Sequence, residues 1–66
     1  MTRIYIEKLA ERVAPMVEKD VTEKELISVI FAEAVKDLGV KAVRQIFLGD
    51  DFLSDVITLV HRIIRK

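Results

Sequence analysis

The single histidine of the chain, His61, is the first residue to consider for catalysis. A general base needs an orienting partner, and on a helix the nearest partners stand three and four positions away. None of the residues at those positions is a carboxylate; they are Ile57, Thr58, Ile64 and Arg65. The two serines, Ser28 and Ser54, have no histidine at a useful local spacing. We therefore predict that the protein is not an enzyme.

The densest acidic cluster, Asp50, Asp51 and Asp55, is the first candidate for metal binding. Carboxylate oxygens suit hard cations, but an EF-hand spreads its acids and a glycine through a twelve-residue loop, and that pattern is absent. Acids at this place also cap a helix and complement its dipole. The sequence has no cysteine for a thiolate site and no glycine-rich phosphate loop. We predict no metal and no other cofactor.

The basic residues that follow Gly39 raise the alternative of a small DNA-binding regulator. In a helix-turn-helix the second helix enters the major groove, and Lys41 and Arg44 would face it. Arg62 and Arg65 would extend this basic surface if the fold brought them close. The formal net charge is zero, however, whereas phosphate neutralisation usually leaves a domain basic. Nucleic-acid binding is therefore the alternative function, and not the one that we favour.

A dimeric ribbon-helix-helix protein is the other form that this alternative takes. A strand over Thr2 to Glu7 would then pair with its copy from a second chain. Its first helix would span roughly Leu9 to Thr22 with Pro15 inside it, where proline removes a backbone donor. We favour a single helix from about Arg3 to Lys19, kinked at Pro15.

The best-marked helix is predicted over about Glu23 to Leu38. Thr22 and Glu25 fit a capping box, in which each side chain satisfies a free backbone N–H at the start of a helix. Gly39 can take the left-handed conformation that closes a helix, and Val40 is placed for a Schellman motif. Most of this helix is apolar, which predicts a central position with contacts on more than one side.

Three polar residues of this helix, Glu33, Lys36 and Asp37, are expected together on a solvated face.

A second well-marked helix is predicted within Asp50 to Lys66, where apolar residues recur at helical spacing. Between the two, Lys41 to Leu48 is predicted as a short helix. Its apolar side chains expected to point inward are Val43, Ile46 and Phe47.

Length and composition favour association with a second chain. The chain has 66 residues, of which 52% are apolar, so disorder is excluded. Below roughly 70–80 residues a hydrophobic core rarely suffices alone, and disulfides, metals or partner subunits are the usual supplements. With cysteine absent and metal ligands poor, self-association remains. The absence of Asn and Cys beside plentiful charge is also a feature of hyperthermophile proteins.

These observations predict one all-α domain over residues 1–66, a compact bundle of three main helices plus one short helix that pairs as a symmetric homodimer. No apolar run reaches the ~18–20 residues of a membrane span, so we expect a cytoplasmic protein. The predicted function is a helical protein–protein interaction or regulatory module. The residues predicted to form its interface are Phe31, Phe47, Leu53, Ile57, Val60 and Ile64.

Overall fold

The computed structural model describes residues 3–49 and 51–65, and these residues form helices and connecting turns without any strand. The helices are α1 (Arg3–Val13), α2 (Glu23–Leu38), α3 (Val40–Gly49) and α4 (Phe52–Ile64), with a 3-10 turn, η1 (Ala14–Met16), after the first. The all-α prediction is confirmed. The count of three main helices and a short one is wrong, because α3, at 10 residues, is nearly as long as α1, at 11.

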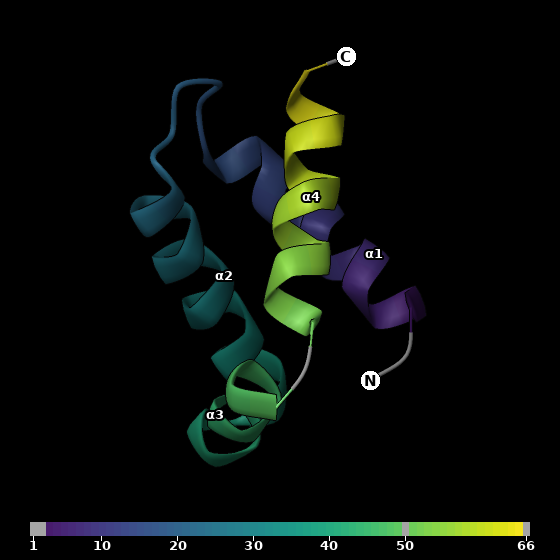
Figure 1. Ribbon diagram of the computed structural model, residues 1–66, viewed down its shortest axis with the longest axis vertical. Helices are drawn as coiled ribbons and strands as arrows, with labels where there is room; N and C mark the ends of the chain where they lie inside the picture. The colour runs from purple at the N-terminus through teal and green to yellow at the C-terminus, as the bar shows by residue number, and fades with distance from the viewer. Residues whose placement is uncertain (1–2, 50, 66) are drawn as a thin grey trace.

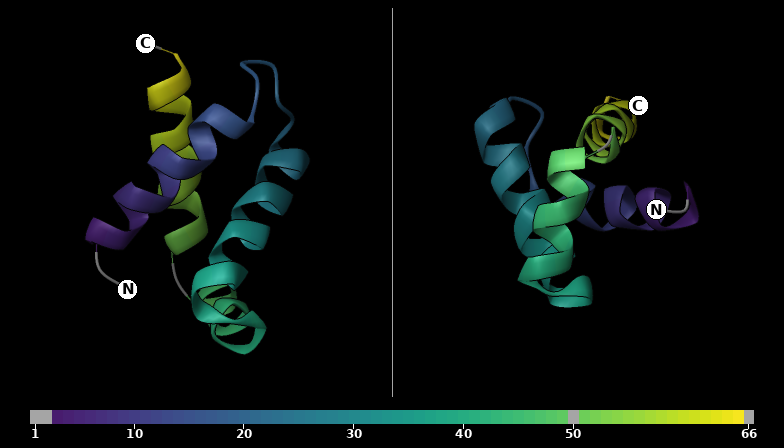
Figure 2. Two further views of the ribbon diagram at one scale, coloured as in Figure 1. Left: turned by 180° about the vertical axis from the view of Figure 1, so that it is seen from behind. Right: turned by 60° about the horizontal axis from the view of Figure 1, so that its bottom comes forward.

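Helix α4 lies on one side of the bundle and crosses α1 at a steep angle, as the views from the front and from behind both show (Figures 1 and 2). The long helix α2 lies beside this pair, and α3 crosses its C-terminal end at the bottom of Figure 1. The Cα radius of gyration is 11.0 Å. About 10.8 Å is expected for a folded domain of this length, so the arrangement is a closely packed bundle.

The core is built from one face of each helix. Its largest fully buried side chains come from all four helices; they are Phe52, Leu9, Leu26, Ile30, Val13, Val43, Val56 and Val60. In α4 the buried residues are Phe52, Val56 and Val60, which recur every four positions as an amphipathic helix requires. This face of α4 packs against α1 and α2, and its burial removes apolar surface from water.

The N-terminal residues depart from both sequence-based predictions. The strand predicted over Thr2 to Glu7 is wrong for Arg3–Glu7, which belong to α1, and Thr2 lies outside the described residues. The kinked helix to Lys19 is also wrong, because α1 ends at Val13 and Pro15 sits in η1. Proline disfavours α-helical geometry in the residue before it and lacks the N–H for the next helical bond. The chain then leaves η1 in extended conformation at Val17 (φ −127°, ψ 159°).

The Thr22 half of the predicted capping box is present at the start of α2. The side chain of Thr22 accepts a hydrogen bond of 3.2 Å from the backbone N–H of Glu25. At the start of α4, Asp51 occupies the capping position, but its side chain makes no capping hydrogen bond. Asp50, the other predicted cap, lies outside the described residues.

Gly39 is the single residue between α2 and α3. Its N–H donates to the carbonyl of Val35 over 2.9 Å, and its own carbonyl accepts from the N–H of Val43 over 3.2 Å, so it closes one helix and opens the next. Its backbone angles are φ 87° and ψ 157°. This conformation differs from the left-handed one of the predicted Schellman motif, because α3 begins at once at Val40. Only glycine adopts it without strain.

Replacement of Gly39 by L-alanine should therefore lower the free energy of unfolding by about 1–3 kcal/mol through backbone strain alone. No atom lies within 4 Å of the position that a Cβ would take, so steric overlap does not contribute. Chemical denaturation of the two chains measures this loss. The control is a synthetic chain with D-alanine at position 39, which tolerates a positive φ and should regain most of the stability. Equal losses for both stereoisomers would contradict the strain explanation.

Candidate functional site

A groove of mixed apolar and polar lining opens where α2, α3 and α4 meet. Its floor consists of Ile27 from α2, Phe47 from α3, and Leu53 and Ile57 from α4, all only partly buried. Its polar rim is formed by Glu23, Asp51, Ser54 and Thr58. The hollow has a volume of about 340 Å³, at the low end of the range for small-molecule sites. An apolar floor with a polar rim is the composition of a protein–protein contact surface.

Four aromatic rings contact one another in a row that includes Phe47 of the groove floor. The rings of Phe31 and Phe47 meet edge to face with their centroids 5.4 Å apart. Phe47 in turn lies 5.8 Å from the buried ring of Phe52, and Phe52 stacks on Tyr5 at 6.3 Å. Aromatic pairs prefer particular relative orientations of their rings, and this preference adds to the stabilisation that burial gives. The groove floor at Phe47 is therefore fixed by packing that extends from α2 to α1.

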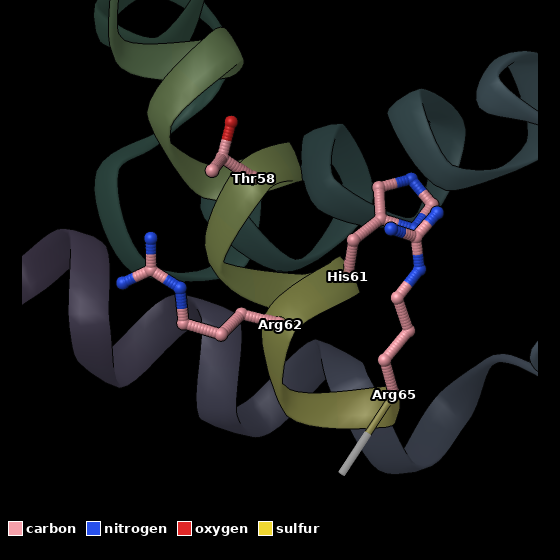
Figure 3. Close-up of a pocket in the computed structure, with 4 residues that line it drawn as sticks. All are labelled: Thr58, His61, Arg62 and Arg65. Atoms are coloured by element: carbon pink, nitrogen blue, oxygen red, sulfur yellow. The ribbon is translucent and has the colours of Figure 1, made fainter.

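A basic patch continues from the groove along α4. It comprises Thr58, His61, Arg62 and Arg65, which line a second hollow. All four project from the same helix, Arg62 to one side and His61 with Arg65 to the other (Figure 3). Among the described residues, the last turns of α4 and its C-cap alone supply the lining of this hollow.

The structure brings three of the six predicted interface residues together. Phe47, Leu53 and Ile57 share the groove, and Phe31 contacts it through the ring of Phe47. Val60 is fully buried in the core and does not reach the surface of the folded chain. Ile64 lies apart, in a hollow that α4 forms with α1 and η1.

The four residues predicted for nucleic-acid binding do not form one surface. Lys41 and Arg44 are exposed on α3, whereas Arg62 and Arg65 are exposed on the last turns of α4. These elements lie at opposite ends of the molecule (Figure 1), whose longest dimension is 31 Å. The strand that a ribbon-helix-helix needs is replaced by α1. Neither form of the DNA-binding alternative gains a continuous basic surface from the fold.

The sequence analysis missed a polar cluster between α1 and α2. Glu33 was expected on a solvated face, but it is 6% exposed. Its carboxylate pairs with Arg12 (Nε to Oε1, 3.3 Å) and with Lys36 (Nζ to Oε2, 2.9 Å). Arg12 also bonds Asp37 at 2.5 Å, and the hydroxyl of Tyr5 donates to the same Asp37 oxygen over 2.8 Å. These contacts join α1 to α2, and each charged group has a partner.

A signal for this cluster is present in the sequence. Glu33 follows Leu26 and Ile30 at the spacing of seven and three residues that aligns side chains on one helix face. That face is buried, so a carboxylate on it requires a cation from another element. Arg12 stands at the C-terminal end of α1, where it meets this requirement. Sequence alone does not identify which of the 11 basic residues takes that place.

Two pKa shifts in this cluster have a clear physical cause. Burial raises the pKa of the Tyr5 hydroxyl to about 12, and its hydrogen bond to the Asp37 carboxylate acts in the same direction. The hydrogen bond from Arg12 holds the pKa of Asp37 below its ordinary value, with a further contribution from Tyr5. Both shifts favour a protonated Tyr5 and an ionised Asp37 near neutral pH, and these are the states in which the two side chains link α1 to α2.

Within residues 3–49 and 51–65, no three His, Asp or Glu side chains lie close enough to hold a metal ion. In the same part of the chain, no helix combines the length and the apolar character that crossing a membrane requires. No protein-family model matches the chain, and no curated protein sequence or solved structure is significantly similar to it. The function must therefore be argued from the surfaces described above.

The raised pKa of Tyr5 predicts a specific alkaline titration. Because the folded pKa lies above the ordinary value of about 10, the contribution of Tyr5 to stability is complete below pH 10 and is lost as the pH rises towards 12. The chain has one tyrosine and no tryptophan, so phenolate absorbance reports on Tyr5 alone.

We expect a midpoint near pH 12 for the folded protein and near pH 10 in denaturant. Asp37→Asn removes the negative charge beside the hydroxyl and should shift the folded midpoint to lower pH. A midpoint near pH 10 for the unmodified folded chain would contradict the burial of the Tyr5 hydroxyl beside Asp37. At acid pH the sign reverses, since the contribution of Asp37 is present above pH ~4 and is lost as the pH falls further.

Proposed function

We propose that the protein is a non-enzymatic interaction module that acts as a homodimer through the groove between α2, α3 and α4. The observation that carries this proposal is the convergence of four apolar side chains, Ile27, Phe47, Leu53 and Ile57, from three helices, into one partly exposed hollow with a polar rim. Ile27 precedes Phe47 by 20 residues in the sequence, so its meeting with the other three is a property of the fold.

The number of apolar side chains that stay partly exposed supports association with a second chain. Among the described residues, twelve apolar side chains form the buried core, and thirteen more pack against it while partly exposed. A chain of this size has too little interior to cover the second group. A partner that covers the groove would remove part of this apolar surface from water, which favours association in proportion to the area buried.

A second copy of the chain is the partner that these observations favour. The surface of the groove and its continuation along α4 presents apolar, acidic and basic groups together, as a self-complementary surface needs. No second protein has to be assumed. Regulation of another molecule would then act through the dimer.

Charge insertion at the floor of the groove tests the proposal. Ile57→Glu and Leu53→Glu would place a carboxylate in a desolvated contact, and each should weaken the dimer at least about tenfold. Sedimentation equilibrium at micromolar concentrations measures the change. Both side chains are partly exposed in the folded chain, so the monomer should remain helical by circular dichroism.

The matched control is Ile4→Glu, which makes the same substitution at a side chain that is 67% exposed on α1, outside the groove. It should leave the association unchanged. If Ile4→Glu weakens the dimer as much as Ile57→Glu does, the contact lies elsewhere and the proposed surface is wrong.

A further inference from the structure

The outer face of α3 combines apolar and basic side chains and carries no acidic one. Val40, Arg44 and Leu48 recur along it every four residues, and Lys41 lies beside them. Val40 is 50% exposed, and Leu48, at 89%, is the most exposed large apolar side chain of the described residues. Since Val43 of the same helix is fully buried, α3 turns one face to the core and leaves this opposite face uncovered.

This outer face borders the groove. Phe47 of α3 belongs to the groove floor, whereas the next residue, Leu48, is turned by about 100° around the helix and lies in solvent. Helix α3 itself lies across one end of the pair formed by α2 and α4 (Figure 1). The groove and the outer face of α3 are therefore neighbouring surfaces, and a two-fold symmetric pair of chains can engage both at once.

The charges on the two surfaces are opposite in sign. The rim of the groove carries Glu23 and Asp51 and no basic residue, whereas the outer face of α3 carries Lys41 and Arg44. Within the described part of the chain, none of these four side chains forms an ion pair. Both surfaces also expose apolar side chains. They are therefore complementary in charge and alike in apolar character.

We infer that in the homodimer α3 of each copy docks in the groove of the other. The inference rests on the proposed function and names the segment that covers the groove. Val40 and Leu48, about 12 Å apart along the helix, then lie over the groove floor, as in other contacts of a helix with a groove. Lys41 and Arg44 face the acidic rim, and symmetry repeats each contact twice. The contact removes Leu48 from water, which favours association.

The basic patch of α4 is the other surface that could meet the acidic rim. Its lining consists of Thr58, His61, Arg62 and Arg65, and none of these is an apolar side chain that could cover the groove floor. The outer face of α3 supplies both the bases and the apolar side chains. It therefore matches the whole groove, whereas the patch matches the rim alone.

Replacement of the exposed Leu48 gives the first test. Leu48→Glu places a carboxylate against the apolar floor and the acidic rim of the partner, and it should weaken the dimer at least about tenfold in sedimentation equilibrium. The side chain is exposed in the folded chain, so the helices should be retained by circular dichroism. The matched control is Ile4→Glu, on the outside of α1, which should leave the association unchanged.

Charge reversal on each surface gives the second test. Lys41→Glu with Arg44→Glu makes the α3 face acidic, and Glu23→Lys with Asp51→Lys makes the groove rim basic. Each variant alone should dimerise at least about tenfold more weakly at low salt, where screening is least. An equimolar mixture should regain dimers with one chain of each kind, because both contacts then join opposite charges.

The control for net charge is Lys8→Glu with Lys19→Glu. It changes the charge of the chain as much as the α3 variant does, at two exposed residues outside both surfaces. Its dimer should be weakened less than that of the α3 variant. Equal weakening would assign the loss to general repulsion and overturn the inference.

The remaining outcomes separate the inference from the proposed function. If Leu48→Glu dimerises like the unmodified chain while Ile57→Glu does not, another segment covers the groove. If Arg62→Glu with Arg65→Glu weakens the dimer and the α3 variant does not, that segment is the basic patch. Masses that rise beyond a dimer would show open-ended docking in place of the two-fold pair. These three results overturn the inference alone, whereas a monomeric unmodified chain would overturn both.

Discussion

The fourth helix carries apolar residues around more of its circumference than the other three helices cover. Its inner face, Phe52, Val56 and Val60, is fully buried, and this burial organises the whole bundle. Leu53 and Ile57, on an adjacent face, remain partly exposed. The same helix thus forms the core of the chain and the floor of its groove. In a chain this short the core and the contact surface are parts of one apolar set.

The polar cluster between α1 and α2 constrains the opposite side of the bundle. Arg12 joins Glu33 and Asp37 across the helix interface, and Tyr5 contributes both a hydrogen bond to Asp37 and a ring stacked on Phe52. Removal of a cation from a buried carboxylate leaves a costly unpaired charge, so such a contact specifies how two helices meet. Through the ring contact of Tyr5, this polar linkage also reaches the aromatic row beneath the groove.

The spacing of apolar residues and the capping residues predicted where helices form better than they predicted where α1 ends or which side chains meet between helices. The spacing of apolar residues identified α2 and α4, and Thr22 capped α2 as its chemistry requires. The N-terminal helix was predicted too long because the effect of Pro15 was judged as a kink, whereas the chain ends the helix there. Burial of Glu33 depends on Arg12, 21 residues earlier in the chain, and no local pattern reveals that contact. For the same reason Phe47, Leu53 and Ile57 could be selected as apolar interface residues, but their meeting with Ile27 required the fold.

The claim on which the rest depends is that the partly exposed apolar surface is covered by a second copy of the chain. The most direct test is the molar mass of the unmodified protein in solution, measured by light scattering over a concentration series from about 1 to 100 µM. A mass near twice the chain mass of 7.6 kDa through the low micromolar range is the predicted result. A folded protein that stays at the mass of a single chain across the whole series would contradict it.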